Sequence, residues 1–424
     1  MSEVVIAGGG LAGLVAAARL AERGIDVTLF ERRGTVGGRV RSREVDGYTL
    51  DRGFQVLLTA YPAVRRELDL AALDLRYFTA GATIARPDRR SALADPLSAP
   101  TSLVETLLNT EVTFGDKLRV AKLRYDLGRT APEACFDGPT ESIREYLDRR
   151  GFSERFVENF VAPFYGGITL DRSLSTDAGV FRYTFKMLAE GATAVPADGM
   201  GAIPRQLADR AERAGATIET GTPVEAVTPE GDADDASVTV ETDGETLAAD
   251  AAVVATDPRS ARELTGVDAV PTESRGCVTQ YFTLRGHRRL DTGRTIVLNA
   301  GGDRPNTVAP LSAVAPEYAP SDGTLLSATT LGTPEESDEE LAQSVRDALV
   351  TWYPEHRFDE LEHLATDRVE FAQFDQPPGF RSSLPAVDAP EAPVYLAGDY
   401  TQWSSIQGAL ESGRVAAERA RDEL

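Results

Sequence analysis

The sequence predicts an α/β fold, and three observations support this prediction. The chain opens with a short apolar run, Val4–Ala7, whose β-branched residues suit a buried parallel strand. A glycine-rich turn, Gly8–Gly13, follows at once and leads into an Ala-rich helix over Leu14–Glu22. A second strand, Asp26–Phe30, comes next. The start of the chain is therefore a strand–helix–strand unit of the kind that builds a Rossmann-like domain.

The glycine-rich turn has the spacing G-x-G-x-x-G at Gly8, Gly10 and Gly13. Gly8 permits the tight turn, Gly10 lets the backbone approach a pyrophosphate, and Gly13 lets the helix pack close to the strand. The N-terminus of the helix presents free N–H groups to the phosphates, and Leu11 and Ala12, in the turn just before it, are expected cofactor contacts. This context, between a strand and a helix, predicts a dinucleotide site.

An acidic residue and a second pair of glycines extend the site. Glu31 follows the second strand and is placed to accept a hydrogen bond from a ribose hydroxyl. The run then reaches Gly37, Gly38 and Arg39. Paired glycines let backbone N–H groups face a second phosphate, and Arg39 can hold that phosphate with its forked donor.

The segment Glu31–Ser42, which includes Arg32, resembles the extended signature of the flavin amine oxidase and carotenoid desaturase superfamily. That signature is an acid, a short loop and then Gly-Gly-Arg. The resemblance implies a Rossmann-like domain that binds FAD rather than NAD, with Arg32 among the cofactor contacts.

Two further segments strengthen the resemblance. Tyr395–Thr401 and Ile406–Gly413 are similar to the C-terminal flavin motif of plant and cyanobacterial phytoene and zeta-carotene desaturases. The similarity implies that Asp399, which follows Gly398, bonds the ribityl chain of the flavin and that Ile406 contacts the isoalloxazine.

The segment Asp51–Pro62 is similar to the glycine-containing strand that lies near flavin and substrate in these desaturases. The similarity implies that Gly53 and Phe54 contact the cofactor and that Tyr61 lies near the substrate. Val224 matches the position whose backbone recognises adenine.

The motifs divide the chain between two expected domains. The FAD-binding domain is expected from residues 1–60, 196–265 and 365–424. A substrate domain of mixed sheet and helices is expected from 61–195 and 266–364. The first insert should be mostly helical, because its apolar spacing is near 3.6; the expected helices are Tyr61–Leu68, Ser102–Leu108, Phe114–Leu127, Ser142–Arg149 and Glu154–Val161. The second insert should hold strands at Cys277–Leu284 and Thr324–Thr330 and a helix at Asp338–Trp352.

Composition indicates the setting of the protein. The formal net charge is −23, and only three of the 44 basic residues are lysines, as in cytoplasmic proteins of salt-loving archaea. No long basic face is apparent, so a nucleic-acid partner is not expected. Cys135 and Cys277 are isolated, which fits a reducing, cytoplasmic compartment. The first strand begins near residue 4, so no signal peptide is expected. The apolar stretch Val4–Leu20 contains several glycines and Arg19, so no transmembrane segment is expected either.

The sequence carries no recognisable catalytic triad, H-E-x-x-H motif or Cys/His cluster. We therefore assign no catalytic side chain and expect no metal. Flavin dehydrogenation needs a C–H bond held against flavin N5 in a dry pocket, and it requires no side-chain nucleophile. A second G-x-G-x-x-G is also missing, so electrons are expected to leave to a quinone or to oxygen rather than arrive from a nicotinamide.

Three substrate classes stay open. The first is a hydrophobic polyene or isoprenoid, for which the insert 61–195 would wall an apolar tunnel that opens at a membrane surface. The second is a protoporphyrinogen. The third is an amine, although family amine oxidases usually place a lysine near flavin N5 and an aromatic residue where this chain has Ser405. No lysine follows Lys186, while Trp403 could form part of an aromatic wall. Tyr61, Trp403 and Ser405 are the candidate substrate contacts.

Overall fold

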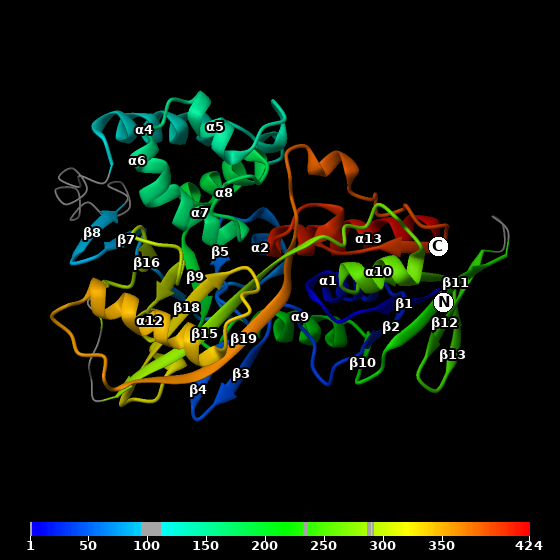
Figure 1. Ribbon diagram of the computed structural model, residues 1–424. Coiled ribbons are helices and arrows are strands. Elements are labelled where there is room, and N and C mark those ends of the chain that lie inside the picture. The colour runs from blue at the N-terminus through cyan, green and yellow to red at the C-terminus, as the bar shows by residue number, and fades with distance from the viewer. Residues whose placement is uncertain (1, 95–111, 232–235, 286–289, 291) are drawn as a thin grey trace.

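The computed structural model of the chain describes residues 2–94, 112–231, 236–285, 290 and 292–424. Its largest elements are a parallel sheet, a mixed sheet and a layer of helices, all seen in Figure 1. The expected helix at 102–108 lies outside the described residues.

The parallel sheet has five strands in the order β10-β2-β1-β14-β20. Their bounds are Thr217–Thr220, Asp26–Glu31, Glu3–Ala7, Ala251–Val254 and Val394–Leu396. Every neighbouring pair is parallel, with Ile6 between Leu29 and Val253. Distant parts of the sequence thus form one sheet, and the predicted α/β class with a discontinuous Rossmann-like domain is confirmed.

Three helices pack together beside this sheet. They are α1 (Leu11–Ala21), α9 (Ala202–Arg213) and α13 (Ile406–Glu423), and α1 lies against both of the others (Figure 1). A Cβ at Gly413 would lie 2.2 Å from the carbonyl oxygen of Ala12. The close approach of α13 to the start of α1 therefore requires glycine at position 413.

A short antiparallel sheet flanks the parallel one. It consists of β11 (Val224–Glu230), β12 (Ser237–Thr242) and β13 (Thr246–Ala249). Strands β12 and β13 form a hairpin around Asp243 and Gly244. Helix α10 (Pro258–Thr265) contacts β11 and β14.

The mixed sheet has seven strands in the order β19-β15-β18-β17-β16-β7-β8. Their bounds are Leu361–Phe374, Ser274–Arg285, Gly323–Leu331, Thr307–Ala309, Ile296–Asn299, Gly81–Arg86 and Arg89–Ala94. Helix α12 (Asp338–Trp352) contacts β19 and β7 and has the predicted bounds. It begins there because Ser337 and Glu340 form a capping box.

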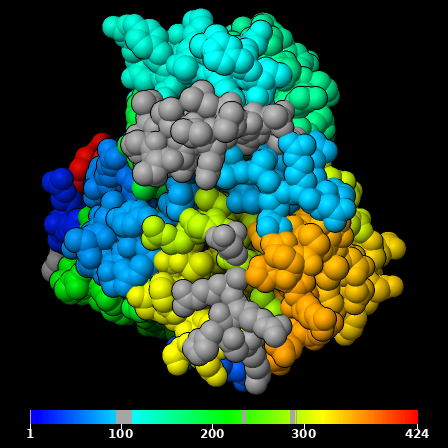
Figure 2. All heavy atoms as spheres, turned by 90° about the vertical axis from the view of Figure 1, so that its left-hand side faces the viewer, coloured from blue at the N-terminus to red at the C-terminus, as the bar shows by residue number. Residues whose placement is uncertain are grey.

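A helical layer lies above the mixed sheet, coloured cyan to green in Figures 1 and 2. Its elements are α4 (Phe114–Gly128), α5 (Ile143–Arg149), α6 (Glu154–Phe156), a π-helical turn (Val157–Val161), α7 (Ala162–Thr169) and α8 (Ala178–Glu190). Helix α2 (Pro62–Glu67) contacts α13. The predicted helix at 154–161 is thus α-helical only over its first turn.

The insert 61–195 is less purely helical than its apolar spacing predicts. It also contains β6 (Leu75–Tyr77), β7, β8 and β9 (Thr193–Pro196). Strand β7 forms a local hairpin with β8 and also pairs with β16, more than 200 residues later; the second pairing leaves no local signal. Strand β9 pairs with β5 (Leu57–Leu58) and β6.

The domain division stays a prediction. Strand β19 passes through the expected boundary at residue 365 and pairs with β15 on both sides of it. The hairpin of β3 (Ser42–Val45) and β4 (Tyr48–Asp51) leads from the glycine-rich loop toward β5.

Candidate active site

A cavity of about 1620 Å³ runs from the glycine-rich turn after β1 to the helical layer. The structure brings almost all of the predicted site residues to its wall, and only Gly13 is not part of the lining. The predicted residues on the wall are Gly8, Gly10, Leu11, Ala12, Glu31, Arg32, Gly38, Arg39, Gly53, Phe54, Tyr61, Val224, Gly398, Asp399, Trp403, Ser405 and Ile406. Their contacts with a ligand stay a prediction.

The three glycines of the first motif have different surroundings. Gly8 has φ +111°, and a Cβ there would lie 2.6 Å from the carbonyl oxygen of Ala255. A Cβ at Gly13 would lie 2.0 Å from the carbonyl oxygen of Gly8. A Cβ at Gly10, by contrast, would have no neighbour within 4 Å, and Gly10 caps α1 without a side-chain hydrogen bond. The first turn of α1 therefore faces open space, as a phosphate site requires.

Glu31 holds the glycine-rich turn in place. It is buried, and its Oε2 accepts a hydrogen bond from the N–H of Gly9 at 2.9 Å. Its Oε1 accepts one from the N–H of Arg33, also at 2.9 Å. The N–H of Gly37 donates to the carbonyl oxygen of Gly9 at 2.7 Å, so the two glycine-rich loops touch. Glu31 thus has a positioning role beside the predicted ribose contact.

Arg39 reaches across the cavity wall to the C-terminal motif. Its Nη2 lies 2.6 Å from Oδ1 of Asp399, and its Nη1 donates to the carbonyl oxygen of Ala372 at 3.1 Å. The other carboxylate oxygen of Asp399 accepts from Ser404 Oγ at 2.9 Å. The forked donor that the sequence assigns to a phosphate is therefore engaged by a carboxylate and a carbonyl. Sequence reasoning missed this link because its partners come from opposite ends of the chain.

Several arginines cluster at this end of the cavity. Arg33 and Arg52 line it, and burial together with Arg52 and Arg33 lowers the pKa of the nearby Arg41. Burial and Arg33 likewise lower the pKa of Arg52. Arg32 donates to Asp257 at 3.0 Å. Cations that repel one another in a partly buried cluster favour binding of an anion such as a pyrophosphate.

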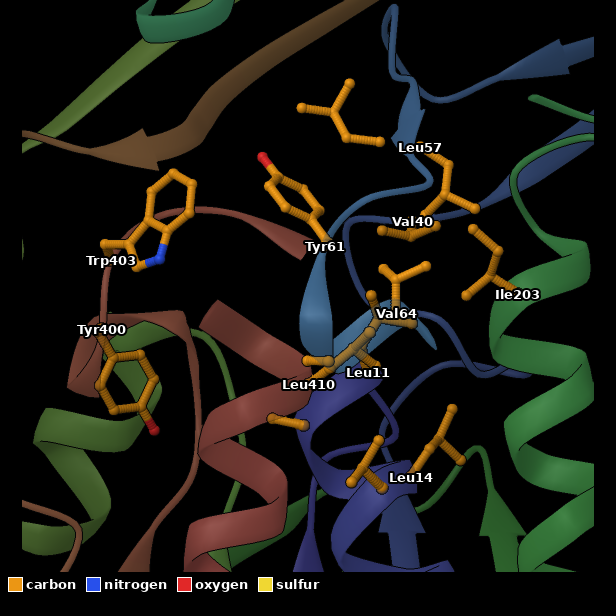
Figure 3. Close-up of a cluster of buried hydrophobic side chains, with 14 of the residues drawn as sticks. Leu11, Leu14, Val40, Leu57, Tyr61, Val64, Ile203, Tyr400, Trp403 and Leu410 are labelled. Carbon is orange, nitrogen blue, oxygen red and sulfur yellow. The ribbon is translucent and has the colours of Figure 1, made fainter. Parts of the chain in front are cut away.

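An aromatic wall lies beside the start of α13. The ring centroids of Tyr61 and Trp403 are 6.1 Å apart at an interplanar angle of 82°, and Figure 3 shows both side chains in this cluster. The ring of Tyr183 lies 5.2 Å from that of Trp403. Burial raises the pKa of Tyr61, so its phenol stays neutral. Ser405 is the N-cap of α13 and accepts a hydrogen bond from the N–H of Gly408 at 2.8 Å.

A ladder of four stacked phenylalanines lines the cavity within the helical layer. The centroids of Phe152, Phe156, Phe160 and Phe164 are separated in turn by 5.1, 5.6 and 5.4 Å. Sequence reasoning missed this feature, although its signal is a phenylalanine at every fourth position. The ladder makes this part of the cavity apolar.

The described residues include no group of three or more His, Cys, Asp or Glu side chains able to hold a metal ion. Within the same residues, no helix combines the length and apolar character needed to cross a membrane. Cys277 lines the cavity, and burial raises the pKa of its thiol to about 11, so the thiol is protonated near neutral pH. No side chain is assigned as a catalytic acid or base.

The sequence matches the family of flavin containing amine oxidoreductases over residues 11–421, and the chain belongs to this family. It is therefore a flavin-dependent oxidoreductase, and the resemblance drawn from the motifs is confirmed.

Sequence relatives include enzymes of two of the three substrate classes left open above. Protoporphyrinogen oxidase 2 of Arabidopsis thaliana is 28% identical over 164 residues, which cover 39% of this chain and 32% of that protein. A 4,4'-diapophytoene desaturase of Staphylococcus aureus is 41% identical over 56 residues, which cover 13% of this chain and 11% of that protein. The chain thus matches about a third or less of the length of these relatives.

Solved structures resemble the whole chain. An oxidoreductase from Methanosarcina mazei has a TM-score of 0.75 at 19% identity, covering 99% of this chain and 100% of that one. A putrescine oxidase bound to putrescine has a TM-score of 0.72 at 17% identity, with 99% of each chain covered. At these identities, the likeness establishes the fold.

Proposed function

We propose that the chain is an FAD-dependent dehydrogenase that forms a carbon–carbon double bond in a large apolar polyene or isoprenoid. A quinone or oxygen would be the final electron acceptor. The observation that carries the proposal is the cavity, because one end is polar and holds a cluster of arginines while the other is walled by the phenylalanine ladder. Its volume of about 1620 Å³ exceeds the roughly 300–1,000 Å³ of most ligand pockets, which suits a dinucleotide together with a long substrate.

The polar end fits FAD. Gly10 leaves the first turn of α1 open, Arg33 and Arg52 supply positive charge, and Glu31 lies on the wall at the end of β2. When bound, FAD supplies the two-electron acceptor that a desaturation needs. Asp399, held by Arg39, would bond the cofactor beside the aromatic wall.

The apolar end fits a substrate without a charged anchor. The ladder from Phe152 to Phe164 offers aromatic faces to the cavity. Burial of apolar surface contributes about 25 cal/mol per Å², so a long hydrocarbon gains affinity along its whole length. The same side chains exclude water from the substrate.

The residues near the aromatic wall favour a hydrocarbon over an amine. Ser405 caps a helix at the position where family amine oxidases have an aromatic residue. Lys186 lies 2.5 Å from Glu190, donates to the carbonyl oxygen of Leu127 at 3.1 Å, and is not part of the cavity lining. Lys186 is therefore not placed to act as the lysine that family amine oxidases have near flavin N5.

A protoporphyrinogen is the second candidate substrate. Of the two sequence relatives described above, the protoporphyrinogen oxidase gives the longer match. Lys117, Arg124 and Arg294 line the cavity, and cations there suit the carboxylates of a porphyrinogen.

The test is anaerobic reduction of the FAD-loaded protein. Phytoene-type carotenes in detergent would be compared with protoporphyrinogen, benzylamine and a polyamine. We expect a carotene to bleach the flavin absorbance and to gain conjugation, seen as a red-shifted product. Bleaching by an amine alone, with hydrogen peroxide formed on re-aeration, would reject the proposal.

A further inference from the structure

The outer face of α4 exposes three large apolar side chains. Phe114, Leu118 and Tyr125 are 69%, 59% and 63% exposed, and they are the three most exposed large hydrophobic residues in the described part of the chain. They lie on one face of the helix, because positions four and seven residues apart fall above one another. A single exposed apolar side chain is common on protein surfaces, but three large apolar side chains on one helical face form a patch.

The helix is nevertheless firmly attached to the protein. Its opposite face buries Asp116, Leu123 and Leu127. Thr113 and Asp116 form a capping box at its N-terminus, and Asp116 also accepts from the N–H of Ser153 at 2.9 Å. The patch is therefore held outward by a rigidly placed helix.

The patch is accompanied by positive charge. Residues 114–129 contain five basic and two acidic residues, a formal charge of +3 in a chain of −23. The five basic residues are Lys117, Arg119, Lys122, Arg124 and Arg129. Lys122 is 70% exposed and lies 3.1 Å from Asp126, while the guanidinium of Arg129 covers the ring of Tyr125 at 5.0 Å. Two of the three lysines of the chain thus lie in this helix.

The same helix forms part of the cavity wall. Val120, Leu123 and Arg124 of α4 line the cavity from its inner side. Figures 1 and 2 show α4 at the outer edge of the molecule, in the helical layer. A surface that binds the outer face of α4 would therefore lie next to the apolar end of the cavity.

We propose that α4 docks the protein onto an anionic membrane surface. Phe114, Leu118 and Tyr125 enter the boundary between headgroups and acyl chains. The exposed basic residues Arg119, Lys122 and Arg129 meet the anionic headgroups, whereas Lys117 and Arg124 line the cavity. A helix with an aromatic and aliphatic face flanked by lysine and arginine binds such surfaces through both forces. The proposal rests on this surface and holds for any substrate of the cavity.

The test is flotation of the FAD-loaded protein with lipid vesicles. We expect binding to phosphatidylglycerol vesicles that is at least fivefold stronger than to phosphatidylcholine vesicles at low salt. The triple variant Phe114→Ser, Leu118→Ser and Tyr125→Ser should lose binding about tenfold or more. The matched control is Tyr77→Ser with Val350→Ser, because both side chains are about half exposed and lie outside α4. This control should bind like the wild type.

A second measurement locates the inserted face. Both native tryptophans, Trp352 and Trp403, are buried, so Leu118→Trp adds an exposed one. Its fluorescence should shift to the blue when anionic vesicles are added. The proposal would be overturned if the protein did not float with the vesicles, or if the triple variant floated equally well. It would also be overturned if the wild type formed a dimer without lipid and the triple variant were a monomer. The dimer would assign the face to a second copy of the chain.

Discussion

Arg39 and Asp399 are 360 positions apart in the chain, and their side chains meet at 2.6 Å on the wall of the cavity. Arg39 follows the paired glycines of the N-terminal motif, and Asp399 begins the short 3-10 helix Asp399–Thr401 that follows β20 in the C-terminal motif. The ion pair therefore joins the two motifs that define the flavin site. Asp399 is buried, and a buried carboxylate is costly unless it is paired, so Arg39 is the partner that offsets this cost.

We predict that Arg39→Met destabilises the flavin-free protein by about 2–3 kcal/mol. The cost is below that of a fully buried pair, because the Arg39 side chain is 32% exposed. Denaturant unfolding measures it. Arg32→Met is the matched control, since the pair of Arg32 with Asp257 is more exposed and should contribute about 1 kcal/mol or less. Equal losses in both variants would show that the Arg39 pair has no special role.

Substitution by alanine should lower the stability of the protein at Gly13 but hardly change it at Gly10. Gly13→Ala places a methyl group against the backbone of Gly8, so unfolding free energy should fall by about 2 kcal/mol or more. Gly10→Ala points a methyl group into open space, so stability should change by less than about 0.5 kcal/mol. Flavin affinity should nevertheless fall at least tenfold in Gly10→Ala, measured by flavin fluorescence quenching. Unchanged affinity would place the phosphates elsewhere.

Asp51 should make stability fall as pH rises. Burial raises its pKa from 3.8 to about 6, although Ser42, Met200 and Tyr318 supply hydrogen bonds. Because the folded pKa lies above the unfolded one, the folded state favours the protonated acid. This stabilisation, about 3 kcal/mol at most, is present below pH 3.8 and is lost as pH rises through 6. We predict that the unfolding free energy of the wild type, relative to that of Asp51→Asn, falls as pH rises from 3.8 through 6.

Asp171 is the control for that experiment, because its sign is opposite. Burial acts to raise its pKa, but hydrogen bonds from Ser173 and Ser175 and the charge of Arg275 lower the pKa to about 2. Its stabilisation is present above pH 3.8 and is lost as pH falls through 2. The corresponding difference for Asp171→Asn should therefore rise with pH. Parallel curves for the two variants would contradict both assignments.

Local sequence signals account for the fold around the flavin site. The first strand, the turn at Gly8 and the helix that follows are specified by neighbouring residues, and the sequence predicted all three. The helix begins at Leu11, three residues before the predicted start at Leu14, because the glycine-rich turn is shorter than expected. The capping box of Ser337 and the apolar spacing behind it likewise fix α12. Resemblance, rather than spacing, then indicated which of the distant segments meet.

Features held by distant partners were not predictable in this way. The pairing of β7 with β16 joins positions more than 200 residues apart, and Arg39 faces Asp399 only once the two ends of the chain have met. The phenylalanine ladder was hidden because apolar residues at helical spacing usually mark a core face. Here the rings from Phe152 to Phe164 line a cavity instead.

NADH and NADPH should not reduce the flavin directly. The sequence has one dinucleotide fingerprint, and the cavity that it opens onto is the predicted FAD site. Either nicotinamide, added without oxygen to the FAD-loaded protein, should leave the flavin absorbance unchanged for many minutes. Dithionite serves as the control that shows the flavin to be reducible. Rapid bleaching by a nicotinamide would require a second binding mode in the same cavity.

Stability should rise with salt up to molar KCl. The chain carries 67 acidic and 44 basic residues, so many acidic side chains have no basic residue to neutralise them and repel one another. Salt screens both repulsion and ion pairs, but the excess of repulsion makes the net effect stabilising, and at molar salt the Debye length is about 3 Å. The midpoint of thermal unfolding should therefore increase steadily with KCl at pH 7. Near the sequence pI of 4.6 the net charge vanishes, so the same titration should give a much smaller increase. A midpoint that stays flat or falls at pH 7 would contradict the prediction that the acidic composition is an adaptation to salt. An equal rise at both pH values would show that salt acts by strengthening the burial of apolar surface rather than by screening charge.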